Sequence, residues 1–103
     1  MRATKNDGGK PDLTLIPSDV LEGIARVFAF GAANYGRANF KSGDAAFASR
    51  CLRAGLRHAM LYGDQDTDPE TGESHLLHAL CSFIMAEHLK NKLGLERKEL
   101  LNG

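Results

Sequence analysis

The sequence predicts a small all-α domain of three or four helices, and two observations carry that prediction. Three segments repeat apolar residues at helical spacing, and each of them ends at a glycine. No segment shows the alternation of apolar and polar residues that is typical of a strand. The 103 residues suffice for one modest core, so we expect a single domain over residues 1–103.

The first 15 residues differ in composition from the rest of the chain. Two glycines, one proline and three basic residues occur there among few apolar ones, which predicts a flexible basic arm. The first helix is expected to begin near Pro17, because Asp19 and Glu22 have the spacing of a capping box, and to end at Gly31. Its apolar residues at helical spacing are Leu21, Ile24, Ala25 and Phe28.

Residues 31–43 are rich in glycine and asparagine, and we expect them to form a loop. The loop contains two aromatic residues, Tyr35 and Phe40. Their rings could stack on a nucleotide base, with Asn34 and Asn39 at its polar edge. The other interpretation is that the rings anchor the loop by packing.

The second helix is predicted from about Ala45 to Tyr62, with Gly63 as its end. Three arginines at positions i, i+3 and i+7 place their guanidinium groups in one row along it. No acidic residue stands four positions away to neutralise them, so the row is either a solvated face or a surface that binds phosphate groups. The three are Arg50, Arg53 and Arg57.

An acidic segment separates the second helix from the third. It carries five acids, no base and no hydrophobic residue between Asp64 and Ser74, which predicts a solvent-facing loop. Ser74 is a good N-cap for a third helix from His75 to about Leu93, with Gly94 as its end. Residues 95–103 are expected to form a short C-terminal tail or helix.

The overall charge excludes some functions. The chain has 13 Lys plus Arg and 13 Asp plus Glu, and this neutrality argues against a protein that binds duplex nucleic acid. No apolar run could span a bilayer and the N-terminus has no signal-like core, so we expect a cytoplasmic protein without a membrane partner. Cys51 and Cys81 are too few for a disulfide scaffold and are expected to be small buried residues.

Three of the four histidines fall within 21 residues that also hold the acidic loop. His75 and His78 are three residues apart at a helix start, which disfavours protonated imidazole and leaves both rings free to accept a metal or a proton. The alternative is that they are ordinary surface residues. Acids of the loop could supply carboxylates to Mg²⁺ or Mn²⁺, or could simply be solvated. An arginine row beside such a loop is well suited to a phosphate group with a divalent metal between the two.

With these residues in hand, the sequence resembles the phage-associated dATP/dGTP diphosphohydrolase family, small helical nucleotide pyrophosphatases often compared with MazG-type enzymes. The matching stretches cover about Leu15 to Leu80, and their RH, DPETG and HxxH elements stand in the family's order. The stretches are LIPSDVLEGIARVFAFGAANYGRANF, LRAGLRHAMLYG and DPETGESHLLHAL. The resemblance implies a MazG-like helical fold and metal-dependent hydrolysis of a purine deoxynucleoside triphosphate to the monophosphate and pyrophosphate, in the host cytoplasm if the chain is phage-encoded.

The family's motifs carry over position by position. The GxxKYGxxNW segment has Asn34 where a lysine is usual and Phe40 where a tryptophan is usual, and the LRH motif ends at His58. The acidic helix signature of MazG-type enzymes is absent, so a site of four carboxylates cannot be transferred. The remaining matched positions are Gly31, Tyr35, Gly36, Asn39, Leu56, Arg57, Asp68, Pro69, Glu70, Gly72, His75 and His78.

Together these observations give one hypothesis for the mechanism. The metal ligands are expected to be Asp68, Glu70, His75 and His78. His58 or Glu70 would orient the attacking water, and the nucleotide would be held by Lys5, Lys10, Asn34, Tyr35, Asn39, Phe40, Arg50, Arg53 and Arg57. Two alternatives stay open: a non-catalytic protein that binds or sequesters a nucleotide on the same scaffold, and an interaction module whose arginine row pairs with the acidic loop of a neighbour.

The third helix predicts self-association. Its apolar residues cover most of its circumference, and two further helices of one chain can hardly surround it. We therefore expect a homodimer or homotetramer that completes the core, with this helix packed against its symmetry mate. The residues concerned are Leu76, Leu77, Leu80, Cys81, Phe83, Ile84 and Met85.

Overall fold

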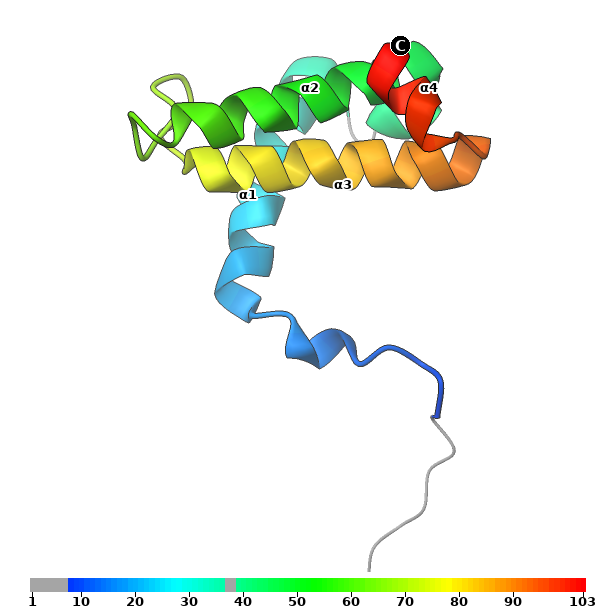
Figure 1. The fold of residues 1–103 in the computed structure, drawn as a ribbon. Coiled ribbons are helices and arrows are strands. Elements are labelled where there is room, and N and C mark those ends of the chain that lie inside the picture. The colour runs from blue at the N-terminus through cyan, green and yellow to red at the C-terminus, as the bar shows by residue number, and fades with distance from the viewer. Residues whose placement is uncertain (1–7, 37–38) are drawn as a thin grey trace, which may run out of the picture.

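A computed structural model describes residues 8–36 and 39–103, and within them the chain forms four α-helices and no strand, as predicted. Helices α2 and α3 lie side by side and antiparallel, α4 covers one end of the pair, and α1 crosses α3 and projects away from it (Figure 1). Two short 3₁₀ helices precede α1 and α2. The elements are η1 (Leu13–Leu15), α1 (Ser18–Tyr35), η2 (Asn39–Ser42), α2 (Ala45–Leu61), α3 (His75–Leu93) and α4 (Arg97–Asn102).

Helix α1 corrects two details of the prediction. Its N-cap is Pro17, and no side chain caps it, so the spacing of Asp19 and Glu22 does not produce a capping box here. The helix also runs through Gly31 and ends at Gly36, whose φ of 98° is the positive value that a glycine stop requires. The predicted loop over residues 31–43 therefore begins with a helical turn, and η2 occupies much of its second half.

Helices α2 and α3 match the prediction closely because both have strong end signals. The Asp44 side chain accepts the backbone N–H of Phe47 at 2.9 Å, and the Ser74 hydroxyl accepts that of Leu76 at 3.0 Å. Gly94, at a φ of 66°, ends α3 in the left-handed conformation. The C-terminal segment forms the short helix α4, which begins with a capping box between Glu96 and Glu99.

Two glycines allow the helices to approach closely. A Cβ at Gly55 of α2 would overlap the ring of Phe83, and a Cβ at Gly23 of α1 would lie 2.7 Å from Leu77 Cδ1. The α2–α3 and α1–α3 crossings therefore both depend on a position without a side chain. Cys81 sits at the second crossing, where its Sγ donates to the Ile24 carbonyl at 3.5 Å.

The best-buried apolar cluster lies where α4 covers the α2–α3 pair. Ala48, Leu89 and Leu100 form it, and Phe47 and Leu52 pack against it. The Ser49 hydroxyl donates to the Leu100 carbonyl at 2.5 Å and ties α4 to α2. Both cysteines are buried and free, as expected. No helix in the described ranges is long and apolar enough to cross a membrane.

Candidate functional site

Three imidazoles meet where α2 ends and α3 begins. The antiparallel arrangement places His58 of α2 against the first turn of α3, with its Nδ1 atom 3.0 Å from the Nδ1 atom of His75. The ring of His58 also stacks on that of His78, with centroids 4.7 Å apart and planes 18° from parallel. From the sequence alone, the distance of His58 from His75 and His78 could not be predicted, because the acidic loop separates them along the chain.

His75 is the most enclosed of the three. Its side chain is 1% exposed, and its Nε2 atom has no hydrogen-bond partner among the described residues. Burial of a polar atom without a partner costs free energy, and a water, an ion or a catalytic role at such an atom can account for it. The His75 ring is therefore not the ordinary surface residue of the alternative interpretation.

The acidic loop is folded back on itself beside these rings. Thr67 and Ser74 form an isolated β-bridge, and the His75 backbone N–H donates to the Asp66 carbonyl at 2.9 Å. Asp68 is half-buried, and its Oδ1 atom accepts the backbone N–H of Glu70 at 2.8 Å. The loop thus holds one carboxylate next to the histidines.

A metal-capable group results. One ligand atom each from His58, Asp68 and His75 lie within 4.8 Å of one another. Two imidazole nitrogens and a carboxylate oxygen are a donor set that fits a divalent cation. Of the four ligands predicted from the sequence, Asp68 and His75 belong to this group, whereas Glu70 is exposed on the loop and His78 makes a different contact.

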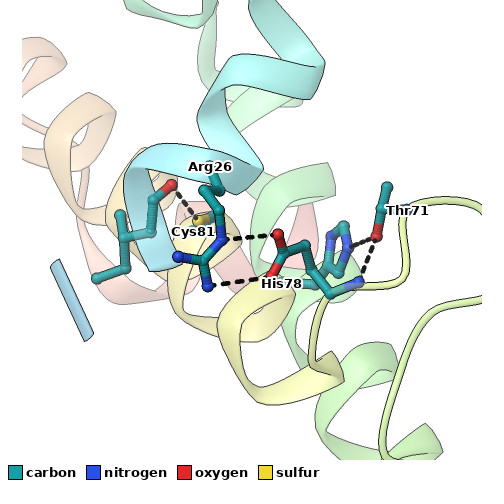
Figure 2. Close-up of polar contacts among 6 residues, drawn as sticks. Arg26, Thr71, His78 and Cys81 are labelled. Atoms are coloured by element: carbon teal, nitrogen blue, oxygen red, sulfur yellow. Dashed lines mark hydrogen bonds and ion pairs between the residues drawn. The ribbon is translucent and has the colours of Figure 1, made fainter. Parts of the chain in front are cut away.

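His78 is held by a residue that the sequence analysis missed. Its Nε2 atom lies 2.7 Å from the Thr71 hydroxyl, which also accepts the backbone N–H of Glu73 at 3.2 Å. The Glu73 carboxylate in turn pairs with Arg26 of α1 at 2.8 Å (Figure 2). This pairing holds the pKa of Glu73 below its ordinary value. No local signal relates Arg26 to Glu73, because 47 residues separate them.

The electrostatics of the cluster favour neutral imidazole at His58. Burial is the main cause that lowers the pKa of His58, and the neighbouring His78, Arg57 and His75 lower it further, against a smaller opposing effect of Asp68. A neutral ring has a free lone pair for a metal or a proton at neutral pH.

The arginine row borders a groove between α2 and α3 with a volume of about 410 Å³. On α3 the lining residues Ser82 and Met85 follow His78 at i+4 and i+7, so the groove continues along the helix face that carries the histidine. Arg53 donates to the Ser49 hydroxyl at 2.9 Å and to the Gly103 carbonyl at 3.2 Å. Its guanidinium is therefore partly committed to α4. The other lining residues are Phe47, Arg50, Cys51, Ala54 and Arg57.

The predicted base-stacking ring lies elsewhere. The Phe40 centroid is 5.5 Å from that of Phe28 and 5.8 Å from that of His88. His88 is 13 residues beyond His75 on α3, or about 20 Å along the helix. The structure therefore gives Phe40 the packing role that the sequence left open.

The remaining predicted binding residues are only partly placed. Lys10 and Asn39 are exposed, in the turn before η1 and at the start of η2. Asn34 and Tyr35 form the last turn of α1, and their side chains fall outside what the structure describes. Lys5 lies outside the described residues.

Comparisons with known proteins agree on one family. A family model described as dATP/dGTP diphosphohydrolase, N-terminal, matches residues 2–98. A curated protein of Salmonella phage PMBT28 named dATP/dGTP diphosphohydrolase is 38% identical over 92 residues, which are 88% of this chain. The chain spans 31% of the length of that relative. No solved structure matches the chain significantly.

Proposed function

The chain belongs to the dATP/dGTP diphosphohydrolase family, and we propose that it takes part in hydrolysing a purine deoxynucleoside triphosphate to the monophosphate and pyrophosphate. The observation that carries this proposal is the groove along α2 and α3, which is lined by the arginine row. Arg57 of this groove directly precedes His58, a member of the metal-capable group with Asp68 and His75. A triphosphate with its cation needs cationic groups for its oxygens and ligands for the metal within one site.

The arginines would bind the phosphates. Arg50 and Arg57 are exposed, and no ion pair is recorded for either across residues 8–36 and 39–103, so both can donate to phosphate oxygens. Arg53 is partly held by Ser49 and contributes less freely. Lys5 or Lys10 of the arm would add positive charge near the leaving pyrophosphate, and Asn34, Tyr35, Asn39 or Phe40 would contact the base only if the ligand reaches the far end of α1.

The reaction requires a water that attacks the α-phosphorus, with the bond to the bridging oxygen breaking as pyrophosphate leaves. A divalent cation, Mg²⁺ or Mn²⁺ by the family's implied chemistry, would polarise phosphate oxygens and lower the pKa of a bound water. The sequence predicts Asp68, Glu70, His75 and His78 as its ligands, and of these Asp68 and His75 belong to the metal-capable group of the structure. His58, whose pKa is lowered, or the exposed Glu70 would take the proton from the water.

The test is a panel of the four deoxynucleoside triphosphates with Mg²⁺ or Mn²⁺, followed for binding and for pyrophosphate release. We expect release from dATP or dGTP, and at least tenfold weaker nucleotide binding in Arg57→Gln. The control is Arg97→Gln, because Arg97 is exposed on α4 outside the groove. Equal binding by both variants would remove the arginine row from the site.

One outcome would support the second candidate, a protein that binds nucleotide without hydrolysing it. The metal-capable group contains a single carboxylate, whereas a MazG-type site would use several. Nucleotide binding that needs no metal and releases no pyrophosphate would favour this candidate over the enzyme.

We propose that a second copy of the chain covers α3. Leu76, Leu80 and Ile84 share one face of the helix and are 46%, 40% and 39% exposed. In the described residues, more large hydrophobic side chains are exposed than are buried, an imbalance that a homodimer or homotetramer would correct. Light scattering tests this: a monomer at micromolar concentration contradicts it, and Leu80→Glu should dissociate the oligomer.

A further inference from the structure

We propose that the group formed by His58, Asp68 and His75 is a site for a transition-metal ion such as Zn²⁺ or Co²⁺, and that it selects such an ion over Mg²⁺. This deepens the proposed function and rests on it for its catalytic meaning. It also reassigns His58 from proton acceptor to metal ligand, which leaves Glu70 as the residue that orients the water.

The spacing of the donor atoms supports a shared ion. The Nδ1 atoms of His58 and His75 are 3.0 Å apart. Two nitrogens bound to one ion at about 2.0–2.1 Å are separated by about 3.0–3.4 Å, depending on the coordination angle. A ligand atom of Asp68 completes a group in which all separations are within 4.8 Å. The side chains therefore need only small movements to converge on one ion.

The burial of His75 supplies an independent observation. The ring is 1% exposed, and its Nε2 atom is unpartnered among the residues that the structure describes. Among the described residues the ring contacts the ring of His58, and the two Nδ1 atoms can approach to 3.0 Å only with a proton or a cation between them. The enclosure of the ring therefore shields its Nδ1 atom, the one that faces His58, from water, while Nε2 is a second polar atom of the same ring whose pairing is not satisfied among the described residues.

The loop prepares the carboxylate for the same ion. The Asp68 backbone N–H donates to the Glu73 carbonyl at 2.9 Å, and its Oδ1 atom accepts the backbone N–H of Glu70 at 2.8 Å. These bonds fix the side chain beside His75 before any ligand arrives. The charge of this carboxylate also offsets the repulsion between a cation and the positive end of α3.

The donor types decide the class of metal. Imidazole nitrogen suits zinc, cobalt and other transition ions, whereas Mg²⁺ prefers oxygen ligands and gives up its waters reluctantly. Two of the three donors here are nitrogens. An oxygen-seeking ion would find one carboxylate in this group, too few to hold it without substrate phosphates.

His78 and Thr71 orient the ring of His58 for metal binding. His78 stacks on His58 with centroids 4.7 Å apart, and the Thr71 hydroxyl fixes its ring through the 2.7 Å contact to Nε2. Metal-binding histidines depend on neighbours that fix their orientation. His78 is therefore a positioning residue for His58 rather than a ligand.

The experiment titrates the full, nucleotide-free chain with Zn²⁺, Co²⁺ and Mg²⁺ by calorimetry, and follows Co²⁺ by its visible absorption. We expect one Zn²⁺ or Co²⁺ per chain at micromolar ion, with Mg²⁺ at millimolar concentration unable to compete. His58→Gln and Asp68→Asn should each weaken Zn²⁺ binding at least tenfold. His88→Gln is the matched control, since His88 lies at the exposed far end of α3.

The outcomes separate this inference from the proposed function. Zn²⁺ affinity that is unchanged in both ligand variants, or that falls in His88→Gln, overturns the site. Circular dichroism of each variant shows whether a lost affinity reflects unfolding, and histidine ring NMR of the wild-type chain keeps the test decisive: Zn²⁺ must shift the His58 and His75 signals and spare that of His88. Hydrolysis with Mg²⁺ alone, without Zn²⁺ binding, leaves the function standing and removes the metal site. Zn²⁺ binding without hydrolysis of any nucleotide supports the metal site and removes the proposed hydrolytic function.

Discussion

The two ends of the α2–α3 pair are built from the same helices but hold together by different means. At one end Leu89 and Ala48, both 0% exposed, pack under α4. At the other end His75 is almost as enclosed, yet it contacts polar groups and keeps a nitrogen without a partner in the part of the chain that the structure describes. We therefore expect the α4 end to contribute more to stability, and the histidine end to lose stability in exchange for groups that can bind a ligand.

Leu89→Ala is the strongest test of that difference. Removing a fully buried leucine should lower the free energy of unfolding by about 2–5 kcal/mol, through lost burial and the cavity left behind. Urea denaturation measures this change. Leu93→Ala is the control, because Leu93 is 42% exposed one turn later and should cost about 1 kcal/mol or less. Equal losses in the two variants would contradict the location of the core.

Gly55→Ala probes the middle of the pair, between the two ends. The added methyl group would overlap the ring of Phe83, so we expect a loss of about 1–3 kcal/mol even though alanine favours helix. Gly31→Ala has the opposite sign, because Gly31 lies within α1 with no atom near its absent Cβ, and should stabilise by about 0.5–1 kcal/mol. Thermal unfolding of both variants is the measurement. Opposite shifts in Tm would indicate that packing against Phe83, and not helix propensity, decides the effect at Gly55.

Thr71→Val tests whether the Thr71 hydroxyl holds the His78 ring. The variant keeps the shape of the side chain but removes the hydroxyl that contacts His78 and accepts from Glu73, so a loss of about 1 kcal/mol is expected. Thr71→Ser keeps the hydroxyl and should retain most of the stability. NMR of the His78 ring should show altered orientation or tautomer only in the valine variant, and an unchanged signal there would contradict the contact.

The pH dependence should be the smallest effect, and it belongs to the histidine end alone. Because the pKa of His58 is lowered in the folded state, the unfolded chain binds more protons between that value and the ordinary 6.5. The contribution of His58 to the stability of the metal-free chain should therefore be fully present above pH 6.5 and be lost as the pH drops below it. Urea denaturation across this range should show a shallower slope in His58→Gln than in His88→Gln.

The sequence predicted elements whose signals are local. Ser74 and Gly94 bound α3 because a cap and a left-handed glycine act within one turn. The predicted stop at Gly31 was wrong because a glycine can also lie inside a helix at some cost in stability, and the positive φ of Gly36 identifies the actual end. The contacts of Thr71, Arg26 and Phe40 could not be predicted, since they depend on how distant segments cross in space.

In the candidate site, too, local sequence signals were predictive and contacts between distant segments were not. The residue types and their spacing drew attention to the histidines and Asp68 before any geometry was known. The choice among ligands depended on the crossing of α2 and α3, which brings His58 to His75 and leaves Glu70 on the exposed loop. Spacing along one helix could pair His75 with His78, but it could not show that His78 faces Thr71.

The two buried cysteines, Cys51 and Cys81, can be used to measure how often the helices separate. Burial raises the pKa of Cys81 to about 12 and also raises that of Cys51, so both thiols should react slowly while the helices stay packed. Cys81 donates to the Ile24 carbonyl of α1, whereas Cys51 lies in the groove between α2 and α3. The rates at which a thiol reagent labels the two residues therefore report separately how often α1 swings off α3 and how often the central pair opens.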